Sequence, residues 1–423
     1  MPRQKKPQPT PVHSKRRARQ SPATAVAEQV ATPAPDAPIA PPKAKQARAK
    51  IIAEIEKARE SRVISYICGD RPGAPAQIGD DAVRPMYDVL RAVGRSKKID
   101  LFLYSRGGAI EVPWRVVSML REYCDRLAVV IPFCAHSAAT LIAIGCDEIV
   151  MSRKAELGPI DPALKRVTQE GGSVLQEDIR VEDVMSYLSF LKDKAGLNDQ
   201  KALADQIRIL GDKLSPWMLG TIYRTHSHIR SVATKMLTSR VERLDEDKTA
   251  LIVQHLAERI YSHNHAITRQ EAKEFGLPVV FSDETLEASM WALLSSYEDM
   301  MDLRRPVDAE QTLGPDRDEA EVKVLSALIE SREVTWAFRG NLKTRRVRQA
   351  SGQININVNL GVALPEGLPQ EQIPQEILNQ LLNQVRDQVP DLVRDQTRRQ
   401  SAIVKIEARF QGAYWQDVTA EGI

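Results

Sequence analysis

The sequence has no long hydrophobic run and only four cysteines. No apolar stretch approaches the roughly 18–20 residues that span a bilayer. The basic N-terminus lacks the apolar segment of a secretory signal, so we expect a cytoplasmic protein, with peripheral membrane association left open. The cysteines show neither paired spacing nor a Cys-x-x-Cys motif, which favours a reducing compartment and argues against a cysteine-bound metal. We expect no metal and no cofactor.

What is present is an ordinary soluble composition with an uneven charge. The 423 residues are 43% hydrophobic and 27% charged, with a net charge of +3. Residues 1–50 hold eleven Lys and Arg against two acids, so the remainder is mildly acidic. Specific nucleic-acid binding is therefore not expected, whereas the basic tail suits an acidic partner or a membrane surface.

Changes in composition divide the chain into four regions. Residues 1–47 are rich in Pro, Ala, Gln and Lys and are predicted to be a disordered tail, followed by a helix from Ala49 to Arg59. Residues 48–303 form the principal domain, and 304–318 have the composition of a linker. Residues 319–423, with alternating Ile354, Ile356 and Val358, are predicted to be a small α+β appendage.

The principal domain begins with alternating strand and helix patterns, which predict an α/β fold. Because strands that alternate with helices form a largely parallel sheet, sites collect at the carboxyl ends of the strands. Gly107, Gly108 and Ser137 all follow directly on predicted strands. Residues 181–303 are predicted to be almost wholly helical, except around 267–281. The strand patterns cover 62–67, 99–105, 126–133 and 147–152, and the helical patterns cover 79–94, 110–124 and 137–145.

The first chemical motif is LYSRGGAIEVPWRVV, in which a strand leads into Gly107-Gly108 and then a helix. Glycines permit unusual backbone dihedrals, so amide N–H groups can be left to bind an oxyanion. A plain tight turn remains an alternative for this pair. Arg106, before the glycines, adds positive charge beside the loop.

The second motif is PFCAHSAATLIAIGCDEIVM, in which Ser137 begins a short buried helix among small residues. Small neighbours would let a substrate backbone reach the hydroxyl, and the helix start favours developing negative charge. The alternative interpretation is that Ser137 only caps the helix.

Together these two motifs make the chain resemble the serine dehydrogenase proteinase family, relatives of signal peptide peptidase A within the Clp-protease/crotonase superfamily. The resemblance extends through ELGPIDP (156–162) and YSHNHAITRQEAKEFGLPV (261–279). It implies a Clp/crotonase-like ββα superhelix with a helical extension. It also implies that Ser137 is the nucleophile and that Gly107 and Gly108 form the oxyanion loop, next to Ala138. Peptide or protein substrates and a trimer-based or ring homo-oligomer are expected on the same ground.

The base that takes the proton of Ser137 stays open at this stage. Relatives of the Clp type place a histidine where this chain has Pro159, and peptidase A relatives use a lysine where this chain offers Arg180 and acids. Arginine stays protonated and cannot be the base. The remaining candidates are His136, His263 (beside Asn264), Lys165, Lys192 and Lys194. His226 and His228 are interpreted as surface or interface residues.

Asp161, in the GPIDP turn, is interpreted as a turn cap or as an acid of the substrate pocket. The favoured function is a serine protease or peptidase. Two alternatives are carried beside it: a catalytically degenerate scaffold of the same fold for assembly or partner binding, and a crotonase-like acyl-CoA enzyme.

Overall fold

The computed structural model describes residues 43–161, 163–170, 173–259, 265–349 and 375–423. The predicted tail lies almost wholly outside these residues, as do the alternating strand at 354–360 and His263 with Asn264. The first helix, α1 (Lys43–Arg59), begins before Ala49, where the sequence pattern placed its start.

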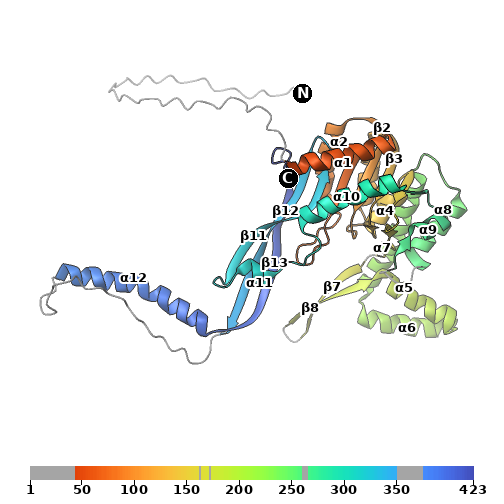
Figure 1. Ribbon diagram of the computed structural model, residues 1–423. Coiled ribbons are helices and arrows are strands. Elements are labelled where there is room, and N and C mark those ends of the chain that lie inside the picture. The colour runs from red at the N-terminus through yellow and green to blue at the C-terminus, as the bar shows by residue number, and fades with distance from the viewer. Residues whose placement is uncertain (1–42, 162, 171–172, 260–264, 350–374) are drawn as a thin grey trace, which may run out of the picture. The chain divides into compact units, whose positions relative to one another are not determined.

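An eight-stranded sheet carries the core, and five of its strands are parallel (Figure 1). The last six residues of β2 are all buried, as expected for a strand covered on both faces. The parallel strands stand in the order β10 (Val279–Phe281), β5 (Glu148–Met151), β3 (Cys124–Ile131), β2 (Ser96–Tyr104) and β1 (Arg62–Cys68).

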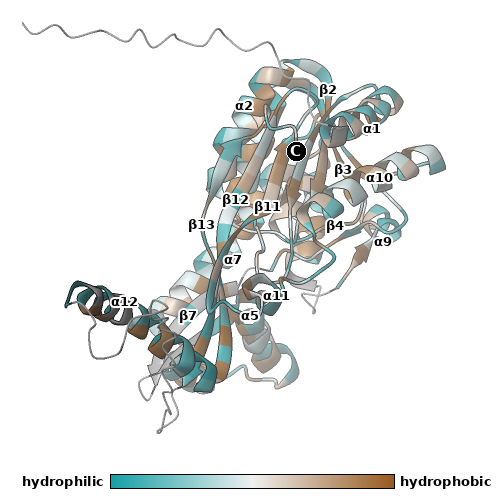
Figure 2. Ribbon diagram, turned by 60° about the vertical axis from the view of Figure 1, so that its left-hand side comes forward, coloured by the Kyte–Doolittle hydropathy of each residue, from teal (hydrophilic) through white to brown (hydrophobic). Residues whose placement is uncertain are grey.

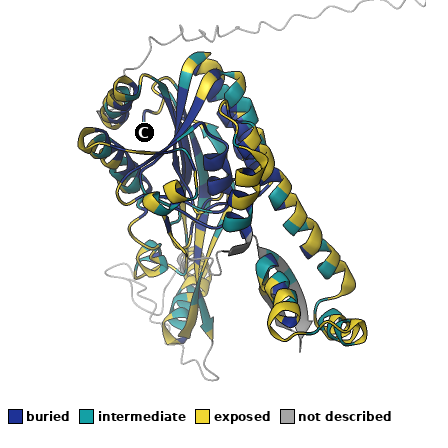
Figure 3. Cartoon of the chain, turned by 90° about the vertical axis from the view of Figure 1, so that its right-hand side faces the viewer, coloured by how far each residue is buried: buried dark blue, intermediate teal, exposed yellow. Residues whose placement is uncertain are grey.

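Helices cover both faces of this sheet and bury it (Figures 1 and 3). On one face pack α2 (Val83–Val93), α3 (Val112–Glu122) and α4 (Ala138–Ile144), whose apolar residues belong to the larger core. On the other face α1 packs with α10 (Glu284–Met301). The predicted α/β alternation is therefore confirmed over this part of the chain.

The strands of the C-terminal region, which was predicted to be a small α+β appendage, continue the same sheet. β11 (Glu319–Glu330) pairs antiparallel with β1, with Ser65 opposite Glu330. β12 (Thr335–Gln349) and β13 (Ala402–Asp417) extend it further. The expected linker also holds a short helix, α11 (Ala309–Leu313), whose Leu313 is buried. Helix α12 (Gln375–Gln400) is largely hydrophilic (Figure 2).

The segment between β6 (Glu156–Leu157) and β10 is mainly helical, as predicted. It begins with a hairpin that the sequence pattern did not indicate. In that hairpin β7 (Ala163–Glu170) pairs antiparallel with β8 (Ser173–Arg180). The helices are α5 (Val181–Ser189), α6 (Gln200–Lys213), α7 (Pro216–Thr238), α8 (Glu246–Gln254) and α9 (Arg269–Glu274). No helix in the described part of the chain is long and apolar enough to cross a bilayer.

A second, small sheet lies next to the carboxyl ends of the parallel strands. It contains β4 (Cys134–Ala135), β6 (Glu156–Leu157) and β9 (Ile267–Thr268). After β2, a single bridge joins Ser105 to Ala135 of this small sheet. Another single bridge joins Gly108 to Ile78. This layer therefore brings the two chemical motifs of the sequence next to each other.

A buried ion pair joins α1 to the end of β11. Arg48 and Glu330 are both 1% exposed, and they make two hydrogen bonds of 2.9 and 3.0 Å. The Glu330 carboxylate also accepts bonds from the hydroxyls of Tyr297 (2.7 Å) and Thr335 (3.1 Å). The charge of Glu330 is thus fully compensated only while Arg48 is present.

We predict that Arg48→Met destabilises the protein by about 3–5 kcal/mol, because it leaves a buried carboxylate without its cation. The free energy of unfolding from urea titration measures this. The double variant Arg48→Met/Glu330→Gln should recover much of the loss, since neither position then leaves an uncompensated charge of the pair. Equal stabilities for wild type and Arg48→Met would contradict the prediction.

Candidate active site

The loop after β2 takes a conformation that requires glycine. Gly107 and Gly108 have φ of 115° and 156°, values that side-chain-bearing residues rarely adopt. A Cβ on Gly107 would stand 2.8 Å from Cβ of Ser137, and a Cβ on Gly108 would overlap the carbonyl oxygen of Ile78. The glycines therefore let the loop approach Ser137 on one side and Ile78 on the other. A plain tight turn does not need such close approaches.

Ser137 stands at the start of α4 with a strained backbone. Its φ of 50° and ψ of −112° are unusual for any residue but glycine, and such strain costs of order 1–3 kcal/mol. Its hydroxyl makes no capping hydrogen bond to the described first turn of α4. The helix-capping interpretation is therefore not supported, and the strain persists without a capping bond to offset it.

The direction of one backbone amide follows from the pairing with Ile78. The carbonyl oxygen of Gly107 accepts the N–H of Ile78 over 2.8 Å. The described chain has no cis peptide bonds, so the N–H of Gly108 points the opposite way, away from Ile78. The neighbouring Gly107 lies against Ser137 and the main chain of His136 and Ala138, so the Gly108 amide belongs to the part of the loop that meets the serine.

A threonine fixes the first turn of α4 to the GPIDP stretch. The Thr140 hydroxyl lies 2.8 Å from the carbonyl oxygen of Ala135 and 2.7 Å from that of Gly158, and it accepts the N–H of Gly158 over 3.2 Å. Sequence reasoning did not single out Thr140. Thr140 could have been identified from the sequence because it lies in the second motif, on the turn after Ser137.

His136 is held beside Ser137 by a carboxylate and a glycine. Its Nε2 lies 3.2 Å from Oε1 of Glu156 on β6, and its ring packs against Gly158, where a Cβ would stand 2.8 Å from Cγ of the histidine. Lys154 pairs with the same glutamate at 3.1 Å. The histidine ring is thus oriented toward the β6 side of the small sheet.

Arg106 is already paired. Its Nε donates to Asp70 over 2.8 Å, and the same carboxylate accepts the hydroxyl of Tyr104 over 2.8 Å. The guanidinium also lies over the ring of Phe133 at 5.9 Å. The positive charge expected beside the glycine loop is therefore largely balanced by Asp70.

The other proposed bases lie in different places. His265, which follows His263 and Asn264 in the sequence, is exposed and pairs with Glu271 at 3.0 Å. Lys192 and Lys194 are exposed in the turn after α5. Lys165 lies on β7, and His263 is outside the described residues.

Asp161 belongs to a buried cluster of titratable groups that the sequence did not predict. Asp161 is 9% exposed and acts on Glu182 at the start of α5. Nε2 of His226 on α7 lies 3.7 Å from Oε1 of Glu182, so His226 is not the surface residue that its sequence pattern indicated. Burial, and then the charge of Asp161, raises the pKa of Glu182 to about 7. Burial and the nearby Arg230 lower the pKa of His226.

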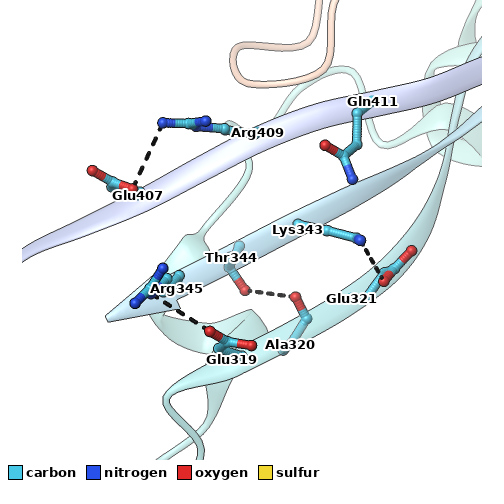
Figure 4. Close-up of a pocket in the computed structure, with 9 residues that line it drawn as sticks. All are labelled: Glu319, Ala320, Glu321, Lys343, Thr344, Arg345, Glu407, Arg409 and Gln411. Atoms are coloured by element: carbon cyan, nitrogen blue, oxygen red, sulfur yellow. Dashed lines mark hydrogen bonds and ion pairs between the residues drawn. The ribbon is translucent and has the colours of Figure 1, made fainter. Parts of the chain in front are cut away.

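A pocket of about 580 Å³ lies elsewhere, on β11, β12 and β13 (Figure 4). Its charged side chains neutralise one another across the strands, as Figure 4 shows. Lys343 pairs with Glu321 and Arg345 with Glu319, both at 3.5 Å. A polar pocket with paired charges offers neither a nucleophile nor an oxyanion donor. Among the described residues no cluster of His, Cys, Asp and Glu suits a metal ion.

Comparisons with known proteins agree with the two motifs. Residues 37–195 match the family of ClpP-like SDH-type serine proteinases. An uncharacterized protein of Methanocaldococcus jannaschii is 26% identical over 62% of this chain and 82% of its own length. A second uncharacterized protein of that organism is 28% identical over 38% of this chain and 63% of its own length. The predicted resemblance to this family and to its ClpP-like fold is thereby confirmed over residues 37–195.

Two solved structures match the chain more distantly. A serine-to-alanine mutant of the 1510-N membrane-bound stomatin-specific protease has a TM-score of 0.29 and 15% identity, covering 52% of this chain and 79% of its own. ClpP1 from Listeria monocytogenes has a TM-score of 0.28 and 14% identity, covering 55% of this chain and 99% of its own.

We predict that Gly108→Ala destabilises the protein by about 1–3 kcal/mol, because the new methyl group meets the Ile78 carbonyl at a positive φ. Thermal unfolding measures the change. Gly211→Ala is the control, since a Cβ there meets open space on α6. A helix interior favours alanine over glycine by up to about 1 kcal/mol, so the control should be neutral or more stable.

We also predict that Glu182→Gln changes the pH dependence of stability. A carboxyl whose folded pKa is raised favours the folded state below its ordinary pKa of 4.5, and this contribution is lost as pH rises through about 7. Glutamine cannot ionise. The unfolding free energy of Glu182→Gln, compared with that of wild type, should therefore be up to about 3 kcal/mol more favourable at pH 8 than at pH 5. Urea midpoints at both pH values measure it, and a pH-independent difference would contradict it.

Proposed function

Because residues 37–195 belong to the ClpP-like SDH-type serine proteinase family, we propose that this chain is a serine peptidase with Ser137 as its nucleophile. The observation that carries the proposal is the placement of Gly107 against Ser137, at the distance that only a glycine allows. The strained backbone of Ser137, without a capping bond, supports it. Strain of this kind is common where a side chain is held for chemistry.

In the proposed reaction Oγ of Ser137 attacks the carbonyl carbon of a peptide bond. The electrons of the carbonyl move to its oxygen, and the Gly108 N–H, with Ala138 beside it, stabilises the resulting oxyanion. Collapse of this intermediate expels the amine and leaves an acyl-enzyme, which water then hydrolyses. Loss of one oxyanion donor commonly costs about 100–1000-fold in rate, so this loop carries a large share of the proposed catalysis.

The Ser137 proton must pass to a base, and two histidines are proposed for this role. His136 adjoins the nucleophile and has an orienting carboxylate in Glu156, which is the second half of a serine–histidine–carboxylate arrangement. Its side chain is directed toward β6, which weighs against it. His263 is kept from the family resemblance alone, as are peptide substrates and a homo-oligomer. The cytoplasmic location is kept as an expectation from the sequence composition.

We expect a fluorophosphonate probe to label the purified wild-type protein and to leave Ser137→Ala unlabelled, because the probe reacts only with an activated serine. Ser118→Ala, a change on the polar side of α3, is the matched control and should label like wild type. Thermal unfolding of all three proteins establishes that they are folded.

Folded wild type that resists labelling would overturn the hydrolase and favour the degenerate scaffold, for which the missing Clp-type histidine at Pro159 is the present argument. Binding of an acyl-CoA ester without labelling would instead favour the crotonase-like alternative.

A further inference from the structure

A buried hydroxyl lies at the base of the glycine loop. Ser105 follows β2 directly and is completely buried. The N–H of Gly107 donates to Oγ of Ser105 over 3.0 Å, and the same Oγ lies 3.3 Å from the carbonyl oxygen of Gly107. One side chain therefore contacts both polar groups of the glycine that touches Ser137.

This contact matters because glycine has little conformational preference of its own. Gly107 is fixed by two outside bonds, its N–H to Ser105 and its C=O to the N–H of Ile78. Together they set the plane of the next peptide, and so the direction of the Gly108 N–H. With the Ser105 hydroxyl removed, the Gly107 N–H is buried without its acceptor and one of the two constraints is lost.

The backbone of Ser105 is itself bonded to the segment that carries the nucleophile. Its N–H donates to the carbonyl oxygen of Cys134 over 3.2 Å, and its carbonyl oxygen accepts the N–H of His136 over 3.0 Å. Ser105 thus holds the oxyanion loop with its side chain and the segment before Ser137 with its main chain.

The buried thiol of Cys68 lies next to the Ser105 hydroxyl. Cys68 ends β1, the strand paired with β2, and the hydroxyls of Ser105 and Tyr66 lie beside its sulfur. Burial raises the pKa of Cys68 to about 12, so the group stays a neutral thiol. The Ser105 hydroxyl therefore has an uncharged neighbour on the side of β1.

We propose that Ser105 is a positioning residue of the active site, which orients the oxyanion-binding amide of Gly108 by holding Gly107. This inference rests on the proposed serine peptidase function. Ser105 does not touch the reacting atoms in this role; it acts through the loop. The sequence signal is its place two residues before the first glycine in YSRGG.

The test compares wild type with Ser105→Ala, using a fluorophosphonate and the activated ester 4-nitrophenyl acetate as probes. We expect the labelling rate and kcat to fall by about 10-fold or more, a fraction of the loss of a whole oxyanion donor. KM should stay nearly unchanged, because the hydroxyl does not contact the ester. Ser105→Thr keeps the hydroxyl and should restore much of the rate.

Ser326→Ala is the matched control, since Ser326 is a buried serine on β11 whose Oγ has no hydrogen-bond partner among the described residues. It should label and turn over like wild type. Unchanged labelling and kcat in a folded Ser105→Ala would overturn the positioning role while leaving the peptidase proposal intact.

Amide hydrogen exchange keeps the two proposals separable. A peptide that covers residues 102–110 should exchange faster in Ser105→Ala than in wild type and Ser326→Ala, because Gly107 has lost its acceptor. If wild type is never labelled, the peptidase proposal fails and the catalytic role of Ser105 fails with it. Faster exchange would then show only that Ser105 holds the loop, and unchanged exchange would overturn that as well.

Discussion

The pairing of the chain at Ser105 with the segment before Ser137 is the constraint on which the candidate site depends. Parallel strands β2 and β3 end at the same edge of the sheet, but their loops meet only because the small sheet continues the hydrogen bonding beyond both ends. At that point a side chain on residue 107 or 108 would prevent the approach. Gly107 is therefore a steric requirement of the approach to Ser137, and Gly108 of the approach to Ile78. Because the Gly107 N–H is bonded to Oγ of Ser105, the Gly108 N–H is the amide of the pair that the proposed reaction uses.

Burial on all sides makes this arrangement rigid. β11 covers the outer edge of β1, and α1 and α10 cover the face opposite α4. The Arg48–Glu330 pair fixes where α1 meets β11, and buried ionic groups of this kind serve specificity more than stability. A strained residue such as Ser137 persists only where surrounding structure over-determines its backbone. The C-terminal strands thus contribute to the site by closing the sheet, without supplying a side chain to it.

Local patterns predicted the parallel strands, the glycine loop and the position of Ser137, because each depends on neighbours close in sequence. The partner of β1 could not be predicted in this way, since the pairing of Ser65 with Glu330 joins residues far apart in the chain. His226 looked like a surface residue, because its helix is only weakly amphipathic and Glu182 comes from a different helix. The positive φ of Ser137 likewise follows from tertiary packing rather than from its own preference.

The candidate site and the cluster of Asp161, Glu182 and His226 rest on parts of unequal packing. Ser137 and the glycine loop lie against the main core, whereas α5 and the first half of α7 pack around a separate, smaller cluster that includes Val181, Val184 and Ile222. Elements with fewer buried contacts open at lower free energy. Glu182 lies at the start of α5, so its ionisation acts on the less stable of the two parts.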